Sequence, residues 1–176
     1  AYNGENLART QNVVVVSVNH RLNILGHLDL SAYGEEYRYS ANVGIYDIVQ
    51  SLEWIQRNIS AFGGDPDNVT LFGQSGGGAK ILALMSSPYA KGLFDKAIVQ
   101  SGATETVGVS FTEAEASRAL TENILGRLGI SGDNIGEIQN VSYRDMMRAG
   151  DAALAEVGAQ FSIPAPFGGY GMEWEP

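Results

Sequence analysis

A serine at the centre of a glycine-rich pentapeptide is the feature of this chain that could do chemistry. Residues 73–77 read Gly-Gln-Ser-Gly-Gly, and Ser75 lies between a strand-like run at 69–72 and a helix-like run at 78–85. A serine presented on a sharp strand-to-helix turn is a nucleophile elbow, and small residues two positions before and after it avoid collisions with the backbone. The first N–H groups of the helix, and the positive end of its dipole, favour an oxyanion forming beside the serine.

The pentapeptide on its own is a weak signal. With 22 glycines in 176 residues, a chance match somewhere in the chain is roughly a one-in-five event at ordinary serine frequency. The alternative interpretation is a glycine-rich turn with an incidental serine. The strand before the pentapeptide and the long apolar helix after it are requirements that few chance matches would meet, so the context favours the nucleophile.

The elements that would position this serine follow a regular alternation. The run 13–18 is almost wholly β-branched and apolar on both faces, which is typical of a central strand of a parallel sheet. Apolar residues between 45 and 59 recur with a helical period. A third short strand is expected at 97–100. This strand and helix order predicts an α/β fold with a doubly wound, mostly parallel sheet, in which active residues lie at the carboxyl ends of strands.

The character of the sequence changes after about residue 103. A capping box at Thr112 begins a helix that is expected to end near Leu128, and a second helix is expected from 142 to about 154. We therefore expect one segment of a domain, in which 1–103 forms the sheet and 104–176 forms a helical insertion followed by a proline- and glycine-rich tail.

Composition and charge exclude several function classes. The net charge of −9, with 11 lysines and arginines and no basic block, argues against nucleic acid or an anionic membrane as a partner. The absence of cysteine excludes disulfides, thiolate catalysis and cysteine-based zinc sites, and it is compatible with a reducing cytosol. No apolar stretch approaches the roughly 20 residues that a membrane span needs.

Several motifs together resemble the type-B carboxylesterases, the cholinesterase-like branch of the α/β-hydrolases. The resemblance runs from about residue 1 to 103 and is looser beyond that point. It implies an α/β-hydrolase fold and hydrolysis of carboxylic esters through an acyl-enzyme. The motifs, which occur in the order and spacing of that family, are Asn19-His20-Arg21-Leu22, residues 42–47, residues 61–66, residues 69–77 and Gln100-Ser101-Gly102.

The resemblance assigns roles to individual positions. Ser75 resembles the acylated nucleophile, and the backbone N–H of Gly76 resembles one donor of the oxyanion hole. Ser101 matches a serine that lies near the catalytic acid. Arg21 and Asp47 match a buried structural salt bridge, for which the alternative is two independent surface charges.

Gln74 departs from the family pattern, in which many members have a glutamate before the nucleophile. A neutral amide removes a nearby negative charge, so we expect a small neutral ester as substrate rather than a cationic, choline-type one. No cofactor is expected. The oxygen-bearing side chains in the turn at 65–68 are interpreted as turn chemistry rather than as a calcium site.

Two parts of the expected catalytic machinery are not found in this sequence. Hydrolases of this fold place the acid and the histidine after the serine, yet no histidine follows Ser75. His20 and His27 precede it and are interpreted as structural or surface residues. We therefore expect an internal segment of a longer esterase, inactive by itself, whose partners are the remaining segments. The acidic residues after Ser75 that we interpret as surface charges include Asp95, Asp151 and Glu173.

Other functions remain open on the sequence alone. A non-catalytic binding module of the same fold is one, although such proteins typically lose the serine. An amidase, a thioesterase or an acyltransferase is another, because the walls of the pocket choose the leaving group and the acceptor.

Overall fold

The computed structural model describes residues 3–102 and 113–161, which fold into two compact units. The first unit comprises residues 1–20 and 45–109, and the second comprises residues 21–44 and 110–176. The helices and strands are α1 (Glu5–Gln11), α2 (Asn23–His27), α3 (Val43–Asn58), β1 (Thr70–Gln74), α4 (Gly76–Ser86), β2 (Lys96–Gln100), α5 (Ala114–Leu128) and α6 (Tyr143–Gln160). Short 3₁₀ helices occupy Ser31–Tyr33, Glu35–Tyr37, Ser40–Asn42, Ile59–Phe62, Pro88–Ala90 and Gly132–Asn140.

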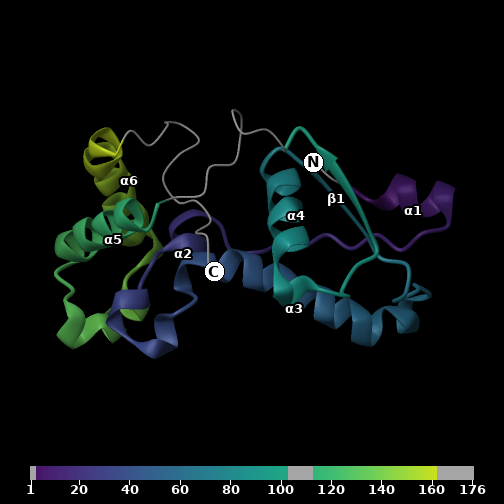
Figure 1. Cartoon of the computed structure of the whole chain (residues 1–176), viewed down its shortest axis with the longest axis horizontal. Helices are drawn as coiled ribbons and strands as arrows, with labels where there is room; N and C mark the ends of the chain where they lie inside the picture. The colour runs from purple at the N-terminus through teal and green to yellow at the C-terminus, as the bar shows by residue number, and fades with distance from the viewer. Residues whose placement is uncertain (1–2, 103–112, 162–176) are drawn as a thin grey trace. The chain divides into compact units, whose positions relative to one another are not determined.

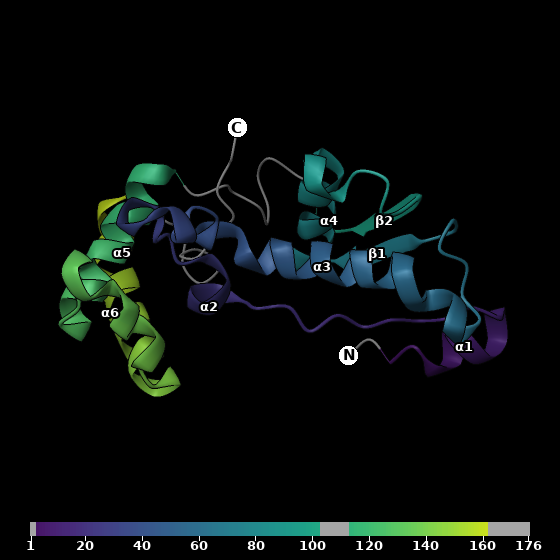
Figure 2. The same cartoon turned by 90° about the horizontal axis from the view of Figure 1, so that it is seen from below.

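The first unit is built on a parallel pair of strands. β1 and β2 pair from Thr70 opposite Lys96 to Gln74 opposite Gln100, so both strands end at the same level. α4 leaves the end of β1 and packs against both strands, as the teal ribbons of Figures 1 and 2 show. The predicted strand, elbow and helix around residue 75 are therefore confirmed, with the helix beginning at Gly76.

Helix α3 supplies most of the core of this unit. Leu52, Ile55 and Ile59 are buried and pack with partly buried side chains from the segments before both strands. The Gln56 amide nitrogen donates to the carbonyl oxygens of Pro66 at 2.9 Å and Leu93 at 3.2 Å, which fastens α3 to the segments that lead into β1 and β2. The helical period predicted over 45–59 is confirmed, and the helix continues into a 3₁₀ turn.

The predicted first strand is absent from the described residues. Residues 13–18 carry no strand assignment, and Val13, Val14, Val16 and Val18 are 40–46% exposed. A β-branched run becomes a strand when a neighbouring strand accepts and donates its backbone hydrogen bonds, and in the described part of the chain the sheet consists of β1 and β2. The described sheet thus has two strands where the sequence predicts three.

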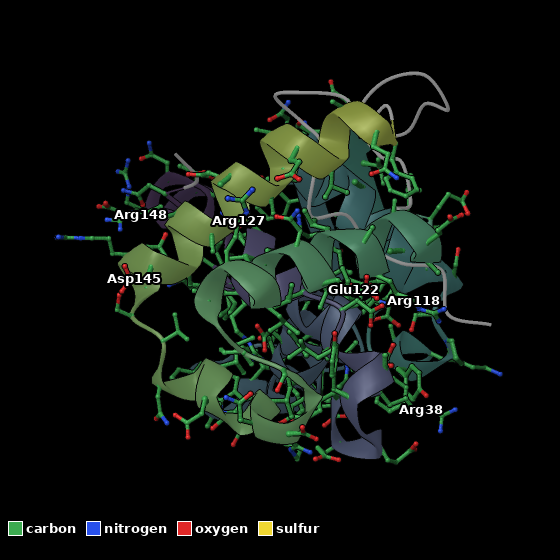
Figure 3. The ribbon with its side chains drawn as sticks, turned by 90° about the vertical axis from the view of Figure 1, so that its left-hand side faces the viewer. Arg38, Arg118, Glu122, Arg127, Asp145 and Arg148 are labelled. Carbon is green, nitrogen blue, oxygen red and sulfur yellow. The ribbon has the colours of Figure 1, made fainter. Side chains whose placement is uncertain are left out.

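The second unit has its own apolar core between α5 and α6. Figure 3 views these helices with side chains drawn. Leu120, Ile124, Ala153 and Val157 are nearly inaccessible, and Ile24 of α2 packs against the same cluster. The guanidinium of Arg127 on α5 forms an ion pair with Glu156 on α6 at the surface.

The ends of these helices differ in part from the prediction. α5 begins after Glu113, whose side chain makes no capping hydrogen bond, while the predicted cap at Thr112 lies outside the described residues. α6 is capped by Ser142, which accepts from the Asp145 N–H at 3.2 Å, and it ends at Gln160 rather than near residue 154. The turn-by-turn apolar positions Ala149, Ala153 and Val157 explain the extra length, because they continue the buried face.

A buried threonine in this core leads to a stability prediction. Thr121 is 1% exposed, and its hydroxyl has no hydrogen-bond partner among the described residues. A buried hydroxyl without a partner costs free energy, so Thr121→Val should raise the free energy of unfolding by about 1 kcal/mol and increase Tm. Thermal unfolding followed by circular dichroism measures the effect. Thr121→Ala, which removes the same hydroxyl but leaves a cavity, is the matched control and should lower Tm; a lower Tm for Thr121→Val would contradict the interpretation.

The predicted division near residue 103 stays a prediction. Residues 21–44 belong to the same compact unit as the helices after residue 110, and the predicted proline- and glycine-rich tail falls outside the described residues from 162 onward. Within residues 3–102 and 113–161, no helix has the length and apolar character needed to cross a bilayer.

Candidate active site

Ser75 lies at the tip of a strained turn between β1 and α4. It is exposed and has φ 54° and ψ −121°, a backbone conformation that residues with a side chain rarely adopt. The Ser75 N–H donates to the Gln100 carbonyl at 2.8 Å, and its own carbonyl accepts from the Ala79 N–H at 3.0 Å. The strand ladder on one side and the helix on the other therefore hold the serine in this conformation.

The glycine two residues before Ser75 is required by close backbone contact. An added Cβ at Gly73 would lie 2.7 Å from the carbonyl carbon of Gly77, which is too short for any real contact. The same expectation is wrong for Gly77, where an added Cβ meets nothing within 4 Å. The two positions differ because Gly73 faces the first turn of α4, whereas Gly77 lies on its open side and is exposed.

A second pair of glycines lets α4 approach the end of β2. An added Cβ at Gly102 would lie 2.6 Å from the Ala79 nitrogen and 2.7 Å from the Gly78 backbone. Gly78 also faces a Val99 methyl group, 3.1 Å from its own added Cβ. Gly102 belongs to the motif Gln100-Ser101-Gly102, but the motif by itself does not indicate this packing role. The signal was available as a third consecutive glycine after Ser75, which a nucleophile elbow alone does not need.

The structure brings together Ser75, Gly76, Gln74 and Ser101. Gly76 is the first residue of α4, so its N–H is one of the helix donors that have no acceptor within the helix. Gln74 is the exposed last residue of β1, and Gln100 lies directly opposite it. Ser101 follows β2 at the level at which Ser75 follows β1, is also exposed, and also has a positive φ, 52°.

The two histidines occupy different surroundings. His27 is 6% exposed in the second unit, and its Nδ1 lies 2.9 Å from the Ala41 carbonyl oxygen, which makes that nitrogen the donor. His20 belongs to the first unit and lines an open groove of about 360 Å³ together with Asp47 and Trp54. Ser75 is not among the residues that line this groove.

The acidic residues after Ser75 take structural or surface positions where they are described. The Asp95 carboxylate accepts from the Val69 N–H at 2.8 Å at the amino end of the strands. Val69 lies six residues before Ser75, which corresponds to roughly 20 Å at about 3.3 Å of rise per strand residue. Asp151 is exposed on α6 in the second unit, and Glu173 lies outside the described residues.

Two further predictions concern charged and turn residues. Asp65 accepts from the Asp67 N–H at 2.9 Å, and Asn68 accepts from the Lys96 ammonium at 2.6 Å, both of which are ordinary turn and surface bonds. Within the described ranges, no three histidine, aspartate or glutamate side chains are grouped to hold a metal ion. Arg21 and Asp47 belong to different units, and their pairing stays a prediction.

Comparisons with known proteins decide the family. The sequence profile described as "Carboxylesterase family" matches residues 1–166. The chain belongs to the carboxylesterase family. This chain is 44% identical over 150 residues to the para-nitrobenzyl esterase of Bacillus subtilis (strain 168), and the match covers 85% of the chain and 29% of that protein. It is 42% identical over 127 residues to the acetylcholinesterase of Danio rerio, and this match covers 72% of the chain and 19% of that protein.

Solved structures agree with this assignment. An esterase from Clostridium hathewayi, described as able to hydrolyse aliphatic aromatic polyesters, superposes with a TM-score of 0.84 at 46% identity. The match covers 99% of the present chain and 33% of the solved chain. The chain thus has the α/β-hydrolase fold of these esterases and spans about a third of the length of the solved chain.

Proposed function

We propose that this chain carries the nucleophile of a serine esterase. The Ser75 oxygen attacks the carbonyl carbon of a carboxylic ester, the alcohol departs, and water then hydrolyses the acyl group from Ser75. The observation that carries the proposal is the strained turn, φ 54° at an exposed serine held between a strand end and a helix start. Backbone strain of this kind persists where a function depends on it, and an incidental serine would not need it. Membership of the carboxylesterase family supports the ester as the substrate class.

The first turn of α4 supplies the electrostatic support for this reaction. Attack by Ser75 places a negative charge on the former carbonyl oxygen, and the Gly76 N–H is the nearest helix donor that has no acceptor within the helix. The Ser75 N–H is already bound to Gln100 and is not available for this role. Ser101, which begins the segment after β2, is proposed to support the triad from the neighbouring strand end.

The general base and the acid are proposed to come from sequence outside these 176 residues. A serine hydroxyl needs a base to accept its proton, and no histidine follows Ser75 in this chain. The partial match to relatives supports this proposal, since the chain spans 29% of the para-nitrobenzyl esterase. The remaining segments of the same enzyme are therefore the expected partners, and a small neutral ester is the expected substrate.

Active-site labelling tests the proposal directly. The full-length protein should react with a fluorophosphonate, and mass spectrometry of its peptides should place the label on Ser75. Heat-denatured protein is the control and should not be labelled. Labelling at another serine, or no labelling of a protein that hydrolyses nitrophenyl esters, would show that the nucleophile lies elsewhere.

The residue before the nucleophile predicts substrate preference. Gln74 is exposed at the end of β1 and neutral, so Gln74→Glu should shift relative kcat/KM toward a choline ester over a neutral ester of the same shape. We expect a shift of about tenfold or less, because solvent screens the added charge. Gln100→Glu, which adds the same charge about 5 Å away on the neighbouring strand, is the matched control and should shift the ratio less. A wild-type preference for the choline ester would contradict the neutral-substrate proposal.

A further inference from the structure

Lys80 places an ammonium group beside the first turn of the nucleophile helix. It lies one turn after Gly76, and long side chains of helical residues point back toward the helix N-terminus. The Lys80 Nζ is 3.4 Å from the Gly76 carbonyl oxygen, and it is 3.7 Å from the point where a Cβ on Gly76 would lie. Standard bond lengths then put the ammonium at most about 6 Å from the Gly76 nitrogen.

The surroundings of this ammonium are unfavourable for a cation. It is half-buried, and it lies at the positive end of the α4 dipole, where cations are destabilised. Burial lowers the pKa of Lys80 from its ordinary value. A long hydrogen bond to one carbonyl is weak compensation, so packing alone does not explain why a lysine occupies this position.

Other titratable groups close to α4 are already engaged or are absent. Within α4, Lys80 is the one titratable side chain, and β1 contains no titratable side chain. On β2 the titratable residue is Lys96, which binds Asn68, and on the 3₁₀ helix 88–90 it is Tyr89, whose ring packs edge-on against Tyr46. Asp95, next to β2, accepts from Val69. Within the described residues, the elements packed against α4 thus offer Lys80 no carboxylate.

We propose that the positive charge of Lys80 assists the proposed esterase by stabilising the oxyanion that forms next to the Gly76 N–H. This inference rests on the proposed function of Ser75 and adds a specific electrostatic residue to it. The charge acts at a distance and takes no part in proton transfer: the hydroxyl proton of Ser75 goes to the general base, and the electron pair of the broken ester bond leaves with the alcohol. The oxyanion would accept from the Gly76 N–H about 3 Å from that nitrogen, so the ammonium lies within about 9 Å of it. A charge at that distance in a partly desolvated site is expected to change the acylation rate by up to about tenfold.

The pH dependence distinguishes this role from a structural one. The assistance is present while Lys80 is protonated and is lost as the pH rises through its lowered pKa. The wild-type acylation rate should therefore decline at alkaline pH, below the range in which an ordinary lysine titrates. A variant without the Lys80 charge should therefore have a lower acylation rate at neutral pH and no decrease of that rate at alkaline pH.

The experiment measures acylation of the full-length protein by p-nitrophenyl acetate, from neutral to alkaline pH, by stopped flow. Lys80→Met should lower the neutral-pH acylation rate by up to about tenfold and abolish the alkaline decline. Lys80→Arg, which remains charged throughout, should keep most of the rate and also lack the decline. Lys96→Met removes a lysine from the adjacent strand and should leave both the rate and the profile unchanged. Because a desolvated charge is lost, Lys80→Met should not lower Tm.

Two results would overturn the inference. One is an alkaline decline that is unchanged in Lys80→Arg, and the other is a neutral-pH rate that is unchanged in Lys80→Met. If Lys80→Met fails to fold, the comparison of wild type with Lys80→Arg still decides the question. Failure of the underlying function looks different, since wild-type protein would then show no acylation that depends on Ser75.

Discussion

Replacing Ser75 with alanine in the full-length protein should lower kcat for a nitrophenyl ester by roughly a millionfold. Removing the nucleophile of a serine hydrolase costs about as much as removing its whole triad, because the remaining groups cannot act without it. The exposed serine in its strained turn is the proposed source of the oxygen that becomes acylated, and alanine removes this oxygen without changing the backbone atoms. Steady-state kinetics with an active-site titration of wild type measure the change.

Ser101→Ala is the matched control for this change. It deletes the same hydroxyl from a residue that also has a positive φ and that follows the neighbouring strand at the same level. Its turnover should fall modestly, and its acylation should persist. An equal decrease in kcat in both variants would mean that Ser101 does more than support the triad. Normal turnover in Ser75→Ala would show that Ser75 takes no part in the mechanism.

The second large effect is expected at Gly73. A methyl group there would lie 2.7 Å from the Gly77 carbonyl carbon and 2.9 Å from its oxygen, so the first turn of α4 must move. Gly73→Ala should destabilise the protein by about 3 kcal/mol and lower kcat at least about a hundredfold, since a displacement of about 1 Å at a nucleophile has that effect. Thermal unfolding and ester kinetics on the same preparation measure both.

Gly77→Ala provides the comparison, because it adds the same methyl group four residues later. That methyl meets nothing within 4 Å, and alanine is the better helix former, so Tm should stay the same or rise. If Gly77→Ala lowered Tm and kcat as much as Gly73→Ala, any side chain near the elbow would be harmful. The close contact between β1 and α4 would then not be the cause.

The sequence predicts the elbow and the helix behind it because their signals are local. Ser75 is surrounded by glycines, and the apolar residues of α3 recur with a helical period that one buried face explains. Such patterns depend on neighbours in the chain, which the sequence displays directly. The family motifs add the expectation of a hydrolase, and the carboxylesterase match agrees with it.

The features that sequence reasoning misses depend on contacts between distant residues. Residues 13–18 have every local property of a strand, but a strand also needs a partner to form a ladder. The contact of Gly102 with Gly78 and Ala79 joins segments more than twenty residues apart. The presence of a glycine in the sequence does not indicate which residues it contacts. Lys80 is a mixed case: its spacing of four residues from Gly76 places both on one helix face, but the burial of its ammonium depends on the tertiary structure.

The left-handed backbone of Ser75 also affects how this protein can be engineered. With φ at 54° and ψ at −121°, the residue best suited to position 75 on conformational grounds is glycine, which avoids a cost of about 1–3 kcal/mol. A library screened for heat resistance alone would therefore enrich variants that have lost Ser75, the proposed nucleophile. A screen for a more thermostable enzyme must therefore also require catalytic activity in each round of selection, because at this position thermal stability and activity favour different residues.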